Sequence, residues 1–177
     1  TITSQKYAGA VAGYSNGNIN NVIANNNKIN VEEETEKNIY VGGIVGKTES
    51  NLAGAKVRGA KIQVTFESKE NTVFLGGIAG LTQNAKIENS EVFDISANTS
   101  KYEGRTYAGG ISGYVIGASI LSCGVSSESS TSRITLNPNN SSSIVGGIAG
   151  FLKDGEVKRC AVGEVELNSH SSAGIVS

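Results

Sequence analysis

Short apolar and glycine-rich runs alternate along the chain with polar connectors, and the same order of runs returns several times. The clearest run has these copies: YAGAVAG from Tyr7, YVGGIVG from Tyr40, FLGGIAG from Phe74, YAGGISG from Tyr107, IVGGIAG from Ile144 and a truncated SAGIVS. Their first glycines are Gly9, Gly42, Gly76, Gly109, Gly146 and Gly174. The run therefore recurs about every 33 residues, and a fixed period of this size indicates a repeat architecture.

Two further elements follow each glycine-rich run in the same register. The first has an apolar, a small and an apolar or small position: Ile19-Val22-Ala24, Leu52-Ala55-Val57, Ile87-Ser90-Val92, Ile120-Cys123-Val125 and Val157-Cys160-Val162. The next alternates with period two: Ile29/Val31, Ile62/Val64/Phe66, Ile95/Ala97, Ile134/Leu136 and Val165/Leu167. Alternation and short apolar runs predict strands, and the Asn-, Ser- and Gly-rich connectors are typical of turns.

Three short strands in a repeat of this length predict one coil of a parallel β-solenoid. We expect an all-β fold of about five coils, with equivalent residues stacked about 4.8 Å apart, in one domain over 1–177. The predicted coils are 7–39, 40–73, 74–106, 107–143 and 144–171, with a partial coil at 172–177. A right-handed winding is expected because parallel crossovers have that hand. Insertions are expected between the third strand of one coil and the first strand of the next.

The glycine-rich strand predicts three ladders, that is, rows of equivalent side chains from successive coils. The ring ladder is Tyr7, Tyr40, Phe74 and Tyr107, next to a glycine ladder of Gly9, Gly42, Gly76, Gly109 and Gly146. The third ladder is Val11, Ile44, Ile78, Ile111 and Ile148. We expect these ladders to face the interior, with the glycines leaving space for the rings.

The opposite face of the same strand is also apolar. Its larger members are Val41, Val45, Leu75, Ala79, Ala108, Val145 and Ala149. A sheet that is apolar on both faces is normally covered on both. Two interpretations stay open: the chain covers or tolerates this face itself, or the face is an exposed contact surface for a partner or a second copy.

Composition and charge narrow the range of functions. The net charge of −1 gives no electrostatic basis for binding nucleic acid or an anionic membrane. No apolar run approaches the roughly 20 residues of a membrane span. The chain contains no Met, which favours a piece excised from a longer protein.

Candidate catalytic and metal-binding residues are sparse. The presence of a single histidine, His170, argues against a His-based metal centre and against a Ser-His-Asp arrangement. The acidic run Glu32–Glu34 with Glu36 lacks the ligand pattern of a tight calcium loop. The other carboxylates do not gather in one predicted ladder, so we expect neither an enzyme nor a cofactor. Cys123 and Cys160 share a register position, which fits stacked free thiols or a disulfide between neighbouring coils.

At this level of detail the repeats resemble a known family. The segments VGGIVGKTESNLAGAKV, GGISGYVIGASILSCGV and VGGIAGFLKDGEVKRCAV resemble the GLUG repeat, and five copies cover essentially the whole chain. Ile in place of the usual Leu and long third-strand loops depart from the pattern. The resemblance implies a secreted or cell-surface repeat module, as in bacterial adhesins and non-catalytic regions of IgA-specific metallopeptidases. It brings no catalytic residue with it.

We therefore expect a non-enzymatic, extracellular structural or adhesive module that forms a stiff rod or stalk. One alternative is a segment of a self-assembling filament that joins through its ends or its apolar face. The other is a carbohydrate-binding or carbohydrate-active solenoid, for which Tyr14, Tyr114 and Phe151 are the candidate aromatic platform. The expected partners are proteins, further copies or surface glycans, and Asn98, Asn139 and Asn140 are sequons whose glycosylation depends on the host.

Overall fold

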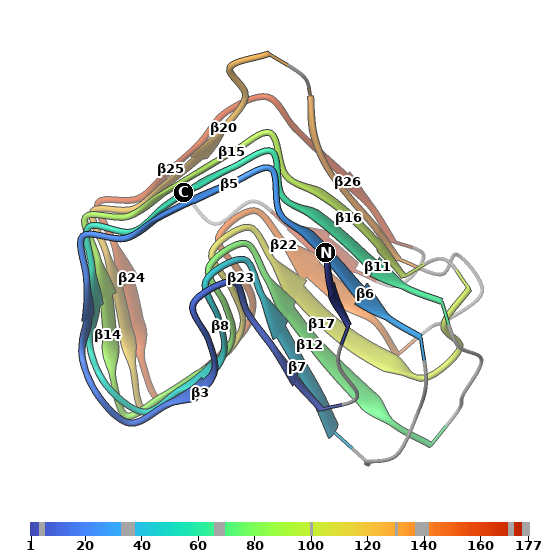
Figure 1. Ribbon diagram of the computed structural model, residues 1–177, viewed down its shortest axis with the longest axis horizontal. Coiled ribbons are helices and arrows are strands. Elements are labelled where there is room, and N and C mark those ends of the chain that lie inside the picture. Colours follow the sequence, from blue (N-terminus) through green and yellow to red (C-terminus); the bar gives the residue numbers. More distant parts are fainter. Residues whose placement is uncertain are drawn as a thin grey trace.

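The computed structural model is a β-solenoid whose coils stack behind one another in Figure 1. It describes residues 1–3, 6–32, 38–65, 70–99, 101–129, 131–136, 142–169 and 172–174. Within these ranges all regular structure is strand, and no helix has the length and hydropathy that a membrane span requires.

Each coil passes through five parallel sheets in turn. The first contains β2 (Tyr7–Ala8), β7 (Asn38–Gly42), β12 (Thr72–Gly76), β17 (Arg105–Gly109), β22 (Ile144–Gly146) and β27 (Ser172–Gly174). The second contains β3 (Ala12–Ser15), β8 (Val45–Thr48), β13 (Ala79–Gln83), β18 (Ser112–Ile116) and β23 (Ala149–Lys153). The third contains β4 (Ile19–Asn20), β9 (Leu52–Ala53), β14 (Lys86–Glu88), β19 (Ser119–Leu121) and β24 (Glu156–Lys158).

The last two sheets complete the coil. The fourth contains β5 (Ile23–Asn25), β10 (Lys56–Arg58), β15 (Glu91–Phe93), β20 (Gly124–Ser126) and β25 (Ala161–Val162). The fifth contains β1 (Ile2–Thr3), β6 (Lys28–Val31), β11 (Lys61–Val64), β16 (Ser96–Thr99), β21 (Ser132–Leu136) and β26 (Val165–Asn168). Strand β12 pairs with β7 and β17, one coil away on either side, so the repeat register of the sequence is the hydrogen-bond register of the fold. The predicted parallel β-solenoid is confirmed.

Three strands per coil is wrong, because two of the predicted strands are each divided in two. A left-handed residue follows each strand directly, Asn21 after β4 and Asn89 after β14, with φ of 52° and 49°. Gly54 fills the same corner in the second coil with φ of 65°. Asparagine and glycine tolerate this conformation better than other residues, so the corner turns at low cost.

The glycine-rich run is divided by a sharp bend between the first and second sheets, visible as the inward apex between β22 and β23 in Figure 1. At this bend Gly77 faces the fourth sheet: a Cβ placed there would overlap the Gly110 carbonyl oxygen and lie 2.9 Å from both methyls of Val92. Gly43, Gly110 and Gly147 contact Val57, Val125 and Val162 in the same way. These glycines and valines form a neck that divides the interior into two lobes.

The bend corrects two predictions about side-chain direction. Val41 and Ile44 are both fully buried although they are three positions apart, an odd number, so strand alternation does not continue through the bend. The same holds for Val45 and Thr48 on either side of Gly46. The predicted contact face is therefore wrong, because its members are core residues: Val41, Val45, Leu75, Ala79, Ala108, Val145 and Ala149.

The ring ladder differs from its prediction in the opposite sense. Tyr7, Tyr40, Phe74 and Tyr107 are half-buried and lie on the outer side, whereas Ile44, Ile78, Ile111 and Ile148 are fully buried. Val11, in the first coil, is 50% exposed. The ladder glycines serve the bend rather than the rings: a Cβ at Gly42 would meet backbone atoms of Val45 and of the next coil.

A long connection distinguishes the fourth coil. Strand β20 ends at Ser126 and β21 begins at Ser132, whereas only Asp94 and Ile95 join β15 to β16 in the third coil. We call the described residues 127–129 of this connection the inserted segment. The segment projects at the corner between the fourth and fifth sheets, at the top of Figure 1. The sequence had placed insertions only between the fifth sheet and the first, so this second position is a difference from the prediction.

Candidate functional site

Aromatic side chains gather on the outer side of the bend, in the angle between the first and second sheets. On the first sheet the Tyr7, Tyr40 and Phe74 rings stack with centroids 5.1 Å apart at each step, and Tyr107 follows at 5.7 Å. Interplanar angles of 9–14° show that each ring face from Tyr40 to Tyr107 lies against a neighbouring ring. The pairing of β7 with β12 sets this spacing, because it fixes Tyr40 opposite Phe74.

A second ladder, on the second sheet, packs against the first. It runs through Tyr14, Lys47, Leu81, Tyr114 and Phe151. The Tyr114 ring meets Phe74 and Tyr107 edge to face at 5.6 and 5.2 Å, and stacks on Phe151 at 5.0 Å. We call the two sets of rings together the aromatic seam: Tyr7, Tyr40, Phe74, Tyr107, Tyr14, Tyr114 and Phe151.

Three polar groups close the first-coil end of the aromatic seam. Tyr14 Oη donates a hydrogen bond to Glu49 at 2.8 Å, and Lys47 Nζ forms an ion pair with the same carboxylate at 2.7 Å. Hydrogen bonds from Lys47 and Tyr14 hold the pKa of Glu49 below its usual range. The bond to Glu49 raises the pKa of Tyr14, because ionisation of the phenol would forfeit it beside a negative charge.

The packing of the seam limits what it can bind. Sugars bind aromatic residues through ring faces, but the faces of Tyr40, Phe74 and Tyr107 are occupied by one another. Tyr14 and Phe151 are the most exposed rings, at 45% and 37%, and lie at opposite ends of the ladder. The proposed platform of Tyr14, Tyr114 and Phe151 is therefore not one continuous exposed surface. The aromatic seam chiefly joins two sheets.

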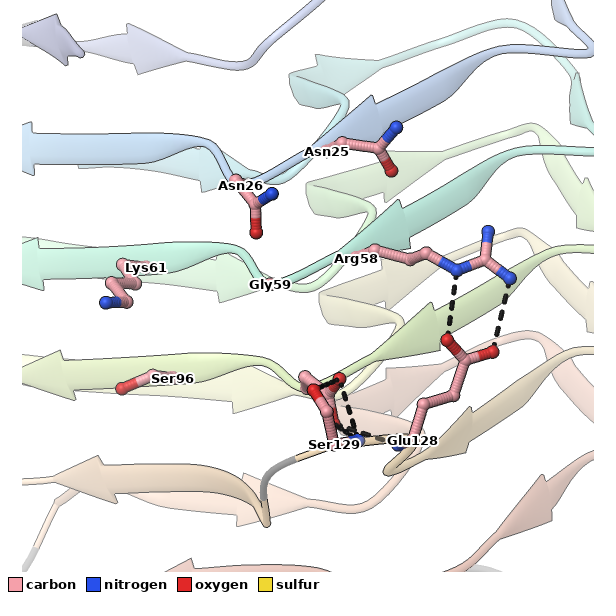
Figure 2. A pocket seen from close by; sticks show the side chains of 9 residues that line it. Asn25, Asn26, Arg58, Gly59, Lys61, Ser96, Glu128 and Ser129 are labelled. Carbon is pink, nitrogen blue, oxygen red and sulfur yellow. Dashed lines mark hydrogen bonds and ion pairs between the residues drawn. The ribbon is translucent and has the colours of Figure 1, made fainter.

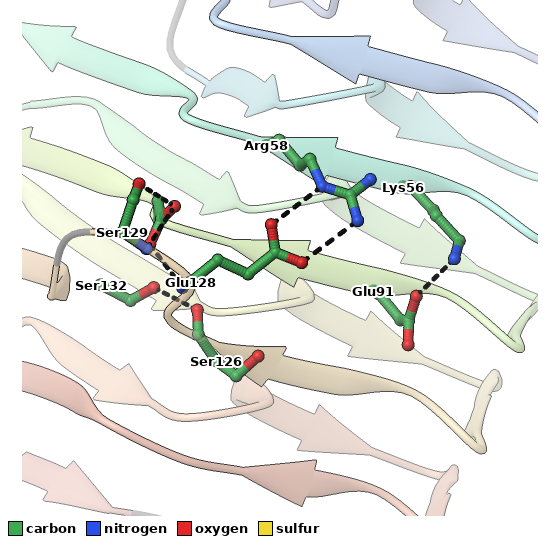
Figure 3. A network of polar contacts seen from close by, with 8 residues as sticks. Lys56, Arg58, Glu91, Ser126, Glu128, Ser129 and Ser132 are labelled. Carbon is green, nitrogen blue, oxygen red and sulfur yellow. Dashed lines mark hydrogen bonds and ion pairs between the residues drawn. The ribbon is translucent and has the colours of Figure 1, made fainter.

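The corner between the fourth and fifth sheets is polar and is held by a network, shown in Figure 3. Asp94 accepts hydrogen bonds from the backbone N–H of Glu128 at 2.9 Å and from the hydroxyl of Ser129 at 2.8 Å. Arg58 donates to both carboxylate oxygens of Glu128 at 3.2 Å, and its guanidinium lies 4.8 Å from the centre of the Phe93 ring. The second, third and fourth coils are thereby tied together through the inserted segment, residues 127–129.

Beside this segment lies a recess of about 520 Å³, which we call the polar recess. Figure 2 shows its side chains coming from successive coils. The first coil supplies Asn25 and Asn26, and the second supplies Arg58, Gly59 and Lys61. The third supplies Asp94 and Ser96, and the inserted segment supplies Glu128 and Ser129. The sequence analysis did not predict this site. Two features of the sequence could have indicated it: the extra length of the fourth coil, and Asn26, Gly59 and Asp94 in one register position, where the structure has left-handed residues.

The two cysteines are free thiols in neighbouring coils. The Cys123 backbone N–H donates to Cys160 Sγ at 3.4 Å, and each thiol points to the carbonyl two residues before it, of Leu121 or Lys158. Ser90 makes equivalent bonds one coil earlier, to the Ala55 N–H and the Glu88 carbonyl. Burial raises the pKa of Cys123 to about 12, so this thiol stays protonated at neutral pH.

The remaining candidate residues are dispersed. Asn98 is exposed on β16, whereas Asn139, Asn140, His170 and Glu33–Glu34 with Glu36 lie outside the described residues. In the part of the chain that the structure describes, no three His, Cys, Asp or Glu side chains are placed to share a metal ion.

Comparison with known proteins adds no relative to this picture. No protein-family model matches the chain, and no curated protein or solved structure matches it significantly. The resemblance to the GLUG repeat therefore stays a prediction, and what is established is a parallel β-solenoid with coils of about 33 residues.

Proposed function

We propose that this chain is a non-enzymatic structural and adhesive module of an extracellular protein, related to GLUG-type repeats. The observation that carries the proposal is the unbroken register between coils in all five sheets. Such a body transmits load along its axis through backbone hydrogen bonds and presents side chains on fixed outer faces. Its mechanism is geometric: the ladders provide stiffness, and outward polar groups provide contacts.

Several features support this proposal over an enzyme. Charged groups on the outer surface pair with one another, either within a coil, as Lys86 does with Glu88 at 3.0 Å, or between neighbouring coils, as Lys56 does with Glu91 at 2.9 Å. Within the described residues the resolved pKa shifts have simple causes, namely burial or hydrogen bonds with neighbouring side chains, and none marks a carboxylate pair poised for acid–base work.

The test has a mechanical and an adhesive part. Small-angle X-ray scattering of the 177-residue chain and of a tandem duplicate is expected to give one cross-section and a maximum dimension that grows with coil number. Beads coated with the folded chain are expected to stay on cell or extracellular-matrix surfaces, and beads coated with urea-unfolded chain are expected to detach. A flexible scattering profile together with equal retention of both beads would refute the proposal.

The filament alternative rests on the same geometry, because strand edges hydrogen-bond equally to a coil of the same or another molecule. Light scattering against concentration, with negative-stain images of the same samples, separates the two. Uniform fibres whose length grows with concentration would make assembly the primary function. A constant molecular mass would retain the rod module.

A further inference from the structure

We propose that the polar recess is a binding site for a short, neutral oligosaccharide. The proposal deepens the adhesive part of the proposed function and rests on it. It moves the carbohydrate contact from the aromatic seam, where ring faces are occupied, to the corner between the fourth and fifth sheets.

The size and charge of the polar recess select the class of ligand. Its volume of about 520 Å³ lies within the range of small-molecule sites. Its lining side chains are polar apart from Gly59, and its two cations, Arg58 and Lys61, balance the two anions, Asp94 and Glu128. A strongly anionic or cationic ligand would gain no net attraction from such a lining, whereas a neutral polyol finds donors and acceptors on every side.

One wall of the recess is fixed before any ligand arrives. Asp94 is held by the N–H groups of Glu128 and Ser129 and by the Ser129 hydroxyl, and Glu128 is held by both guanidinium contacts from Arg58. Fixed polar groups lose little conformational entropy on binding, which favours a weakly interacting ligand.

The rest of the lining carries the groups that remain available. In the described part of the protein, no hydrogen bond or ion pair engages the side chains of Asn25, Asn26, Lys61 and Ser96. Figure 2 shows that they come from three successive coils and take no part in the contacts drawn among Arg58, Glu128 and Ser129. Two amides and a hydroxyl both donate and accept, and an ammonium donates, which matches the vicinal hydroxyls of a sugar.

The test uses the 177-residue chain on an array of neutral and anionic glycans, with dissociation constants for retained neutral oligosaccharides measured by NMR titration. The recess variants are Asn26→Gly and Lys61→Ala. Asn26 is left-handed, and Gly59 occupies its ladder position in the next coil, so glycine there keeps the backbone geometry.

Each variant has a matched control. Asn21→Gly removes the same amide from a left-handed corner outside the recess, with Gly54 in the equivalent position of the next coil. Lys28→Ala removes an exposed lysine from the same ladder as Lys61, one coil away and outside the recess lining.

The expected result is retention of neutral oligosaccharides, weakened about two- to tenfold by each recess variant and unchanged by each control. No retained neutral glycan, or equal effects of recess and control variants, would overturn the proposal. Retention of sulfated or uronic glycans alone would overturn the neutral class. Bead adhesion that persists in the recess variants with no glycan binding would refute this inference while leaving the adhesive module standing.

Discussion

The aromatic seam and the polar recess lie at two corners of the solenoid, and their side chains differ in how fully they contact one another. At the seam every central ring contacts other rings; Tyr114, for example, contacts Phe74, Tyr107 and Phe151. At the recess Arg58, Asp94, Glu128 and Ser129 are joined by hydrogen bonds. The side chains of Asn26, Lys61 and Ser96 line the same recess and keep polar groups available to a ligand. A ladder whose side chains contact one another stabilises the rod. A ladder interrupted by an insertion leaves polar groups that a ligand can bind.

The largest effect is expected from removing a central ring of the seam. Phe74→Ala deletes two stacking contacts and one edge contact and is expected to lower the free energy of unfolding by about 3 kcal/mol. Urea unfolding followed by circular dichroism measures it. Ile23→Ala, at a 63% exposed position, is the control and should change little. Equal small losses in both variants would mean that the rings do not join the sheets.

A smaller loss is expected from widening the angle of the bend. A Cβ at Gly80 would lie 2.6 Å from the Phe74 carbonyl oxygen and from the Val41 nitrogen, so Gly80→Ala forces the two sheets apart. We expect a destabilisation of about 1–3 kcal/mol, measured by the same urea titration. At Gly124 nothing lies within 4 Å of an added Cβ, and the next coil has Ala161 there. Gly124→Ala should be neutral, and a comparable loss there would contradict the close-approach explanation.

Releasing the inserted segment should cost less. Asp94→Gly keeps a residue that tolerates the left-handed conformation but removes the acceptor of the Glu128 and Ser129 amides. We expect a loss of about 1 kcal/mol, together with faster hydrogen exchange of those two amides. Asp154→Gly is the matched control, because Asp154 is left-handed and holds no inserted segment. Unchanged exchange in the Asp94 variant would show that Arg58 alone holds the wall.

The smallest effect concerns the polar end of the seam. Because the bond to Glu49 raises the pKa of Tyr14, Glu49→Gln is expected to return it towards the ordinary tyrosine value. The phenol would then ionise at lower pH, which an ultraviolet absorbance titration detects. Tyr14→Phe assigns the signal by deleting it. A rise in the Tyr14 pKa on losing the carboxylate would reverse the assignment of cause.

The repeat of Gly42, Gly76 and Gly109 was sufficient to predict stacked coils, since a nearly constant period leaves few alternatives to a solenoid. Side-chain direction could not be read the same way. Alternation predicts facing only along an uninterrupted strand, and the bend at Gly43 and Ile44 resets it, so that Val41 and Val45 are both buried. The polar recess was harder still, because it combines residues such as Asn26 and Glu128 from coils far apart in the sequence.

The glycine–valine neck has a consequence for how such a chain tolerates change. Because Gly43 and Gly77 contact Val57 and Val92, the two lobes of the interior are separate narrow channels rather than one wide core. A larger side chain in one channel cannot be accommodated by space in the other, so the two channels of each coil pack independently. Substitutions on opposite sides of the neck should combine additively in stability, while pairs within one channel should not. Each half of the coil can then accumulate substitutions without compensating changes in the other half.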